Sequence, residues 1–214
     1  MSSKIATKPE VQIKKKSGLR ENIEAILIAI VLALFIRTFV VQAFKIPSGS
    51  MKETLQIGDH ILVNKFLYGV KLPFVDKTII PFKDPKRGDI VVFKFPKEPD
   101  KDYIKRVVGV AGDVISIRNK KVYVNGQLQK NSHIMHTDPH IYPAIVQPRD
   151  NMKPRTVPPD SIFVMGDNRD NSYDSRFWGF VNLKAVRGKA FIIYWSWNSE
   201  DFGVRWNRLG NLLK

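Results

Sequence analysis

Apolar residues follow two different patterns along this 214-residue chain, and the change comes near residue 44. Before that point they gather in one dense segment at 23–44, IEAILIAIVLALFIRTFVVQAF. After it they form short β-branched runs separated by glycine, proline, asparagine and aspartate. The first pattern is typical of a long apolar helix, and the second is typical of strands joined by turns.

The segment at 23–44 is long enough to cross a bilayer, which takes about 20 residues. Its densest part covers only residues 25–36, and Arg37 interrupts the remainder. Residues 1–22 carry six lysines and arginines but only two glutamates. An excess of positive charge beside an apolar segment keeps that side in the cytoplasm. We therefore predict a basic cytoplasmic tail at 1–22, one transmembrane anchor at 23–44 and an extracytoplasmic domain at 45–214.

Two other interpretations of this segment stay open. A cleaved signal peptide has the same layout of a basic region followed by an apolar one. A helix buried in a protein core can also be apolar all round. We favour a retained anchor because Val41, near the end of the segment, is larger than the small residues that a cleavage site requires.

Seven short runs beyond the apolar segment are rich in β-branched and aromatic residues, as strands are. Asn125-Gly126 supplies a tight turn after one of them. Many short strands separated by turns predict a mostly β domain, with antiparallel strands arranged as a barrel-like fold or a sandwich. The runs are 60–64, 89–95, 103–110, 114–117, 121–124, 161–165 and 190–195.

The stretch at 131–159 interrupts this series of strands. It contains six prolines, at positions 139, 143, 148, 154, 158 and 159. Because proline removes a backbone donor and fixes φ, we expect an irregular excursion with little regular structure. The sequence assigns this excursion no function.

Composition narrows the classes of partner and chemistry. The chain has 35 Lys and Arg residues against 20 Asp and Glu, a net charge of +15. Such an excess suits nucleic acid or an anionic lipid surface. The basic residues are scattered, however, and their one run, at 14–16, lies just before the apolar segment, so we expect a phospholipid bilayer as partner and no nucleic acid. The absence of cysteine excludes disulfides, thiolate nucleophiles and zinc sites built on cysteine.

A serine-containing turn follows the apolar segment almost directly. Ser48-Gly49-Ser50 is flanked by apolar residues, and glycine lets a backbone approach a ligand closely. Such a tripeptide is more often a plain turn. To act as a nucleophile, Ser50 needs a base. A Ser–His–Asp triad stays open but has no local support, because no strong motif contains any of the four histidines, at 60, 133, 136 and 140.

Lys105 is the other candidate base. It lies in an otherwise apolar strand, where alternation puts it on one face with Tyr103 and Val107. On the strand alone, a solvent-exposed lysine on an edge strand is the more common case. A lysine base must lower its pKa from about 10.4 to near 7–8, a change of roughly 3–5 kcal/mol. Burial among apolar groups supplies a shift of that size.

A polar loop follows the predicted strand at 161–165. Residues 166–176 read GDNRDNSYDSR and combine two arginines, three aspartates and two serines. A solvated loop is the simpler interpretation. So many complementary polar groups in so short a stretch favour a hydrogen-bonded network that supports a functional site.

Together these segments resemble the bacterial type I signal peptidases, the leader peptidases that use a Ser–Lys dyad. The matching stretches run in the family's order and cover most of the chain beyond residue 44. Each stretch is modest alone, but the combination is highly specific. They are residues 46–51 with Thr54 and Leu55, then 58–65, 86–93, 102–109, 166–176 and Trp178-Gly179.

The resemblance implies a role for four of the matching polar residues. Ser50 attacks the scissile carbonyl, and unprotonated Lys105 takes its proton and later protonates the leaving amine. The Ser50 backbone N–H and the Ser48 hydroxyl form the oxyanion hole. Ser172 hydrogen-bonds the Lys105 amine and orients it.

The resemblance also implies supporting and substrate-binding residues. Asp174 and Arg176 form a supporting ion pair, and Gly166 leaves room beside the lysine. A substrate binds as an extended strand next to the segments that hold Ser50 and Lys105. The shallow apolar pockets that receive it are lined by Phe44, Ile46, Leu55, Tyr103 and Ile104.

By this resemblance the chain is a membrane-anchored serine endopeptidase that needs no metal or other cofactor. It removes signal peptides from exported preproteins, cutting after small residues at the first and third positions before the bond, on the outer side of the cytoplasmic membrane. Glu53 is a departure, because the family commonly has proline there. Two rivals stay open: a self-cleaving regulator with the same dyad and a related β fold, and a basic, lipid-bound β module without enzymatic activity.

Overall fold

The structure is a computed structural model that describes residues 18–71, 78–80 and 83–213. The chain divides into two compact units, Met1–Ile36 and Arg37–Lys214. Most of the predicted basic tail at 1–22 therefore lies outside the described residues.

The described part of the first unit forms helix α1, at Gly18–Phe35. None of the helix residues is buried, and apolar side chains such as Leu19, Ile26 and Val31 are exposed along it. Among the described residues, no helix is both long enough and apolar enough to cross a membrane.

The sequence predicts that the apolar segment is helical as far as Phe44, but the helix ends earlier. A short π-helix, η1, covers Ile36–Val40, and Val41–Lys45 form strand β1. β1 pairs antiparallel along its whole length with β2, at Asp59–Asn64. The predicted end of the helix is wrong because valine, alanine and phenylalanine fit an apolar helix or a strand, and the partner strand decides between them.

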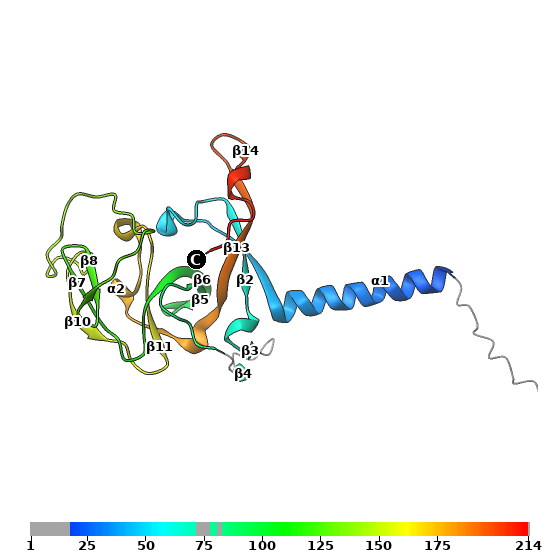
Figure 1. The fold of residues 1–214 in the computed structure, drawn as a ribbon, viewed down its shortest axis with the longest axis horizontal. Coiled ribbons are helices and arrows are strands. Elements are labelled where there is room, and N and C mark those ends of the chain that lie inside the picture. The colour runs from blue at the N-terminus through cyan, green and yellow to red at the C-terminus, as the bar shows by residue number, and fades with distance from the viewer. Residues whose placement is uncertain (1–17, 72–77, 81–82, 214) are drawn as a thin grey trace, which may run out of the picture. The chain divides into compact units, whose positions relative to one another are not determined.

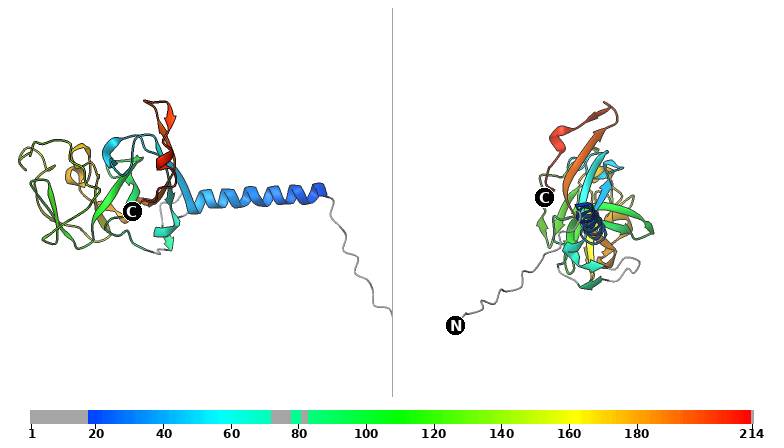
Figure 2. Two further views of the ribbon diagram at one scale, coloured as in Figure 1. Left: turned by 45° about the horizontal axis from the view of Figure 1, so that its top comes forward. Right: turned by 90° about the vertical axis from the view of Figure 1, so that its right-hand side faces the viewer.

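The second unit is built on an eight-stranded antiparallel sheet (Figures 1 and 2). Its strands follow the order β1-β2-β13-β5-β6-β11-β12, and β14 pairs with the C-terminal end of β13. The β13–β14 hairpin projects from the unit in Figure 1 and in the left view of Figure 2. The bounds are β5 Ile90–Phe95, β6 Glu98–Val110, β11 Ser161–Met165, β12 Val181–Asn182, β13 Val186–Asn198 and β14 Gly203–Val204.

A four-stranded antiparallel sheet with the order β10-β7-β8-β9 belongs to the same unit (Figure 1). Asn125 and Gly126, both at positive φ, make the predicted tight turn between β8 and β9. A two-stranded sheet completes the described strands. The bounds are β7 Val114–Arg118, β8 Lys121–Val124, β9 Gln127–Leu128, β10 Met152–Thr156, β3 Val70–Lys71 and β4 Thr78–Ile80.

The predicted irregular excursion at 131–159 contains strand β10, so the expectation of little regular structure is wrong for residues 152–156. β10 is an edge strand, and an edge strand tolerates a proline such as Pro154 because one side of its backbone has no partner strand. Between residues 131 and 151 the described backbone forms no helix or strand apart from one bridge, Met135 opposite Asn168.

Short helical turns connect the strands of the described second unit. Two of them carry segments singled out from the sequence, because η2 contains Ser50 and η4 lies in the polar loop. Asp174 caps α2, and its carboxylate accepts a hydrogen bond from the Arg176 N–H. The bounds are η2 Gly49–Met51, η3 Phe66–Tyr68, η4 Arg169–Asn171, α2 Ser175–Trp178, η5 Leu183–Ala185 and η6 Trp206–Arg208.

The mostly β, antiparallel fold is confirmed, and one part of its core carries the segment around Ser50. Ile46, Met51 and Leu55, which flank Ser50 in the sequence, are all buried there. Burying a large apolar side chain contributes about 1.5–3 kcal/mol, so the core holds this segment firmly. The other buried members, mostly from β2, β5 and β13, are Ile61, Val63, Ile90, Val92, Ala190, Ile193 and Leu213.

Candidate active site

Ser50 is held on η2 by core contacts on both sides. Ile46 and Met51 are buried, and the Ile46 N–H donates to the Asp59 carbonyl at 2.8 Å. Ser50 itself is 8% exposed. Its hydroxyl oxygen lies 3.4 Å from that of Ser48, which is exposed. The two serines predicted to act in one site are therefore neighbours in space.

Lys105 reaches Ser50 from β6. Its Nζ donates to Ser50 Oγ at 2.8 Å and to the Ile104 carbonyl at 3.0 Å. β6 lies between β5 and β11, and Lys105 is only 4% exposed. The alternative of an exposed lysine on an edge strand is therefore wrong. In its neutral form the same amine is in position to accept the Ser50 proton.

The pKa of Lys105 is lowered to about 8. Burial is the main cause, because a charged amine loses its hydration in the protein interior. The Asp174 and Asp167 carboxylates oppose this shift, and the Arg176 guanidinium adds to it. A pKa near 8 leaves part of the amine neutral close to pH 7, as a general base requires.

Gly166 directly follows β11 and lies against two of the predicted site residues. A Cβ at this position would overlap the Ser172 side chain and the Ser50 carbonyl oxygen. Only glycine lets the backbone approach so closely. The space that the absent side chain of Gly166 leaves is filled by the Ser172 side chain and the Ser50 carbonyl oxygen.

Asp174 and Arg176 form the predicted ion pair. Both are buried, and Arg176 Nε and Nη2 each donate to the carboxylate at 2.8 Å. Asp174 also accepts from the Gly166 N–H at 3.1 Å, and Arg176 donates to the carbonyls of Arg149 and Arg169 at 2.9 and 2.6 Å. Burial alone would raise the pKa of Asp174, but Arg176, Ser172 and the Gly166 N–H together outweigh it and hold that pKa below its usual range. The polar loop is therefore a buried network rather than a solvated loop.

Ser172 lies in this network but does not make the predicted bond to the lysine. Its hydroxyl oxygen is buried, and its interaction with the Asp174 carboxylate helps to lower the pKa of that carboxyl. The Lys105 amine donates to Ser50 and Ile104 instead. The role of Ser172 in orienting the lysine therefore stays a prediction.

A cleft of about 370 Å³, called the Ser50 cleft below, is lined by Ser50 and Lys105 and by two predicted substrate-binding residues, Tyr103 and Ile104. In the described chain no histidine lines this cleft, and no group of three or more metal-ligating side chains is present. The other lining residues are Pro47, Ser48, Gly49, Asp102, Asn171 and Tyr173. The remaining predicted substrate-binding residues lie in or against the core, and their contact with substrate stays a prediction: Ile46, Leu55 and Phe44.

A second buried ion pair beside the site is not predicted by the sequence. Arg106 and Asp167, 2% and 0% exposed, meet through two bonds of 2.8 Å. Thr54 donates to the same carboxylate at 2.6 Å, so the pair joins β6, the polar loop and the turn after Ser50. One signal was present, because an arginine in an apolar strand needs a buried partner of opposite charge.

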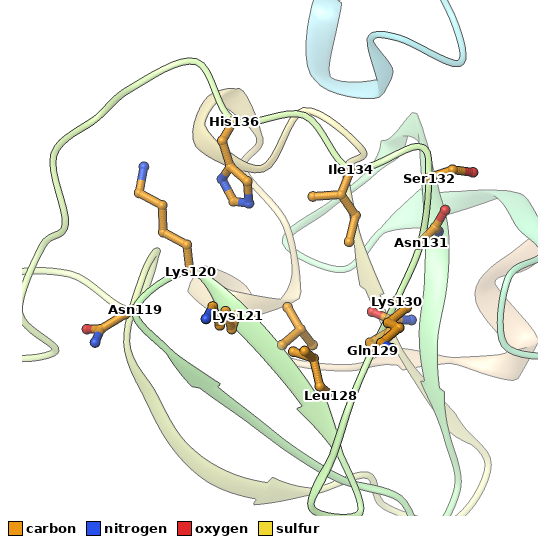
Figure 3. A pocket seen from close by; sticks show the side chains of 11 residues that line it. Asn119, Lys120, Lys121, Leu128, Gln129, Lys130, Asn131, Ser132, Ile134 and His136 are labelled. Carbon is orange, nitrogen blue, oxygen red and sulfur yellow. The ribbon is translucent and has the colours of Figure 1, made fainter.

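A separate pocket of about 640 Å³ lies between β8, β9 and residues 131–136 (Figure 3). Its lining includes Lys120 and His136 but neither Ser50 nor Lys105. Lys120 Nζ and His136 Nδ1 lie 2.9 and 3.3 Å from Asp170 Oδ1, in the polar loop. The His136 contact joins the excursion to the polar loop, and the Lys120 contact joins the turn before β8 to it.

A serine, a buried amine of lowered pKa and an open cleft are the components of a serine peptidase. The sequence profile described as "Signal peptidase, peptidase S26" matches residues 19–195. The chain therefore belongs to the signal peptidase family, peptidase S26, and is a serine endopeptidase.

Two relatives agree in sequence with this assignment. Signal peptidase I of Pseudomonas aeruginosa is 40% identical, in an alignment that covers 78% of this chain and 69% of that protein. Signal peptidase I of Aquifex aeolicus is 35% identical, in an alignment that covers 83% of this chain and 85% of that protein. A crystal structure of a signal peptidase I from Enterococcus faecalis V583 is 28% identical, with a TM-score of 0.40, and covers 50% of this chain and 97% of that one. The family assignment contradicts both rivals, the self-cleaving regulator and the lipid-bound module without activity.

Proposed function

We propose that this enzyme removes signal peptides from exported preproteins with a Ser50–Lys105 dyad. The observation that carries the proposal is the 2.8 Å contact between Lys105 Nζ and Ser50 Oγ at the Ser50 cleft. The lowered pKa of Lys105 supports its role as base, and the signal peptidase relatives support the class of substrate.

The proposed reaction passes through an acyl-enzyme. Neutral Lys105 takes the proton from Ser50 Oγ while that oxygen bonds to the scissile carbonyl carbon. The protonated lysine then gives its proton to the leaving amine as the C–N bond breaks. In the second step Lys105 takes a proton from water as the water oxygen bonds to the ester carbonyl carbon, and it then gives that proton to Ser50 Oγ as the ester C–O bond breaks.

The oxyanion hole of this mechanism uses the Ser50 N–H and the Ser48 hydroxyl. Ser48 is exposed at the Ser50 cleft, and its hydroxyl lies 3.4 Å from the nucleophile oxygen, which favours a shared site for the reacting carbonyl. Donors held in place before reaction stabilise the developing negative charge without reorganisation, and one such donor is worth about 10²–10³ in rate.

The proposed specificity is for small residues at the first and third positions before the cut bond. Tyr103 lines the Ser50 cleft and stacks on Phe95, with 4.4 Å between ring centroids and 3° between ring planes. A stacked aromatic wall is stiff, so it limits the size of the side chains that an extended substrate can place against it.

The proposed location of the catalytic unit is the outer surface of the cytoplasmic membrane. One transmembrane segment near the N-terminus anchors it, and the basic tail lies in the cytoplasm. Exposed apolar residues of α1 and the positive charges before it support contact with a phospholipid bilayer. Near the β13–β14 hairpin, Trp197, Phe202 and Trp206 are exposed, and such aromatic side chains favour the membrane–water interface.

Cleavage of a preprotein by the full chain in detergent tests the dyad. Ser50→Ala and Lys105→Met are each expected to lower kcat at least about 10³-fold. Ser132→Ala and Lys121→Met are the matched controls, because they change exposed residues of the same types outside the Ser50 cleft and are expected to keep the parent rate. A fully active Ser50→Ala enzyme would disprove the proposed nucleophile.

Thiol labelling tests the proposed topology. Because the chain has no cysteine, a single Ser3→Cys or Ser199→Cys substitution introduces the sole thiol. In intact cells a membrane-impermeant reagent is expected to label the cysteine at 199 and not the one at 3. Labelling of both, or of residue 3 alone, would contradict the single crossing.

A further inference from the structure

Asn168 holds two consecutive carbonyl groups of the turn that carries the nucleophile. Its side-chain Nδ2 donates to the Gly49 carbonyl at 3.3 Å, and its backbone N–H donates to the Ser50 carbonyl at 3.2 Å. Asn168 is 3% exposed, so both bonds are shielded from water. No role for this residue follows from the dyad or from its supporting ion pair.

The bond to Gly49 bears directly on the Ser50 N–H, because the two groups belong to one peptide unit. A peptide unit is planar, and in its trans form the C=O and the N–H point in opposite directions. Fixing the direction of the Gly49 carbonyl therefore fixes the direction of the Ser50 N–H. Lys52 N–H donates to the same carbonyl at 3.2 Å, so the carbonyl has one local donor and one from the polar loop.

The side chain of Asn168 bonds the Gly49 carbonyl and does not cap the helical turn that it begins. Asn168 occupies the N-cap position of η4, where an asparagine oxygen ordinarily accepts a hydrogen bond from the first turn. Here it makes no side-chain cap bond, and its buried Oδ1 has no hydrogen-bond partner among the described residues. An amide with its oxygen unsatisfied is a poor stabiliser of the fold, which favours a role at the site.

The backbone around Asn168 is itself held on both sides. The Met135 N–H donates to the Asp167 carbonyl and the Arg169 N–H donates to the Met135 carbonyl, both at 2.9 Å. The Asp167 carboxylate is bound by buried Arg106. Asn168 thus reaches the nucleophile turn from a fixed base.

We propose that Asn168 is a positioning residue of the oxyanion hole, aiming the Ser50 N–H at the reacting carbonyl oxygen through its hydrogen bond to the Gly49 carbonyl. The inference rests on the proposed function of Ser50 as nucleophile. Asn168 touches neither substrate nor reacting atoms in this scheme, and its contribution appears only as negative charge develops on the carbonyl oxygen.

Asn168→Leu in the full-length enzyme tests the proposal, because leucine has nearly the shape of asparagine but makes no hydrogen bond. We expect kcat to fall about 10- to 100-fold, since a small misplacement of a catalytic donor has an effect of that size. KM is expected to change less than about twofold, because ground-state binding does not use the oxyanion hole. Asn168→Ala, which cannot clash, serves as the second variant.

Inhibitor binding gives a readout that a merely structural role would not move. A peptide aldehyde forms a hemiacetal with Ser50 and places an oxygen in the oxyanion hole, so its inhibition constant is expected to rise by the same factor as kcat/KM falls. The cleaved signal peptide, which binds without a bond to Ser50, is expected to keep its affinity.

Asn151→Leu is the matched control. The Asn151 side chain also bonds backbone groups, accepting from the Asn119 N–H and donating to the Tyr142 carbonyl, but neither partner belongs to the turn that carries Ser50. The Asn151→Leu substitution is expected to lower thermal stability more than Asn168→Leu does and to leave kcat unchanged.

The outcomes separate this inference from the proposed function. If Ser50→Ala is inactive while folded Asn168→Leu and Asn168→Ala keep kcat within about twofold, the inference on Asn168 is overturned and the dyad stands. The inference would also be overturned if Asn168→Leu weakened the binding of the aldehyde and of the cleaved signal peptide by the same factor. An active Ser50→Ala would overturn both.

Discussion

Burial has two opposing effects at Lys105. The loss of hydration that lowers its pKa to about 8 also makes the protonated amine unfavourable in the folded protein. Its hydrogen-bond acceptors, Ser50 Oγ and the Ile104 carbonyl, are neutral groups and offset little of this penalty. A lysine in this setting is suited to catalysis at the expense of stability.

The first prediction concerns the pH dependence of cleavage. Because the proposed base is the neutral amine, kcat/KM is expected to rise with pH, to reach half its plateau near pH 8, and to fall about tenfold per pH unit well below that value. Initial rates on a preprotein peptide from pH 6 to 10 measure this profile. A profile that stays flat through the neutral and alkaline range would contradict a titrating lysine.

The second prediction concerns stability. The folded pKa of Lys105 lies below its ordinary value of 10.5, so between about pH 8 and 10.5 the unfolded chain binds more protons and stability rises with pH. Lys105→Met removes the penalty and is expected to stabilise the protein by about 3 kcal/mol at pH 7. The gain is expected to vanish above pH 10.5. Urea unfolding of both proteins at the two pH values measures the difference, and a difference that does not change with pH would refute the argument.

The elements around the site differ in how well the sequence predicts them. β5 is buried and appears as a nearly continuous apolar run, so it is predicted well. The predicted run at 103–110 covers the buried half of β6 and misses its exposed, polar start at 98–102. The end of α1 is predicted poorly, because the residues that follow it suit a helix and a strand equally well. The strand β10 is hidden by Pro154, which only an edge position tolerates.

The site residues show the same contrast. Ser50 and Lys105 were predicted because their segments match a family pattern. The contacts of Arg106 with Asp167 and of Asn168 with Gly49 join residues 61 and 119 positions apart. No local pattern records such partners, since they depend on how β6, η2 and the polar loop pack.

The third prediction tests the close approach of β11's end to η2. Gly166→Ala puts a methyl group where the Ser172 side chain and the Ser50 carbonyl lie, so it must push the polar loop and the turn that carries Ser50 apart. We expect kcat to fall about 100-fold, because a shift near 1 Å has an effect of that order. Gly112→Ala, in a turn with nothing near the added atom, is the control and is expected to keep kcat despite its strained positive φ. Equal rates for the two variants would contradict the contact.

At the scale of the whole molecule, the unit boundary at Ile36 and Arg37 does not coincide with the end of the apolar segment at Phe44. The last residues of that segment form β1 and complete the large sheet. A truncation planned from the apolar pattern alone would remove a strand of the catalytic unit.

The fourth prediction follows from this difference. A fragment of residues 37–214 is expected to fold and to cleave a soluble peptide. A fragment of residues 46–214 lacks β1, leaves the edge of β2 open, and is expected to melt at a lower temperature and to aggregate more readily. Each kcal/mol lost lowers the Tm by roughly 2–4 °C in a domain of this size. Thermal unfolding and light scattering compare the two, and equal Tm values would show that β1 contributes nothing.

The position of β6 between β5 and β11 also decides how late in synthesis of the chain Lys105 can become buried. A ribosome releases Ser50 early, but the strand and loop that bury Lys105 end only at residue 176. Until they pair, the lysine is hydrated, keeps its proton at neutral pH and is no base. If Lys105 is the base, as proposed, a chain still being synthesised carries a serine without its partner, and the dyad forms only after the polar loop has been made.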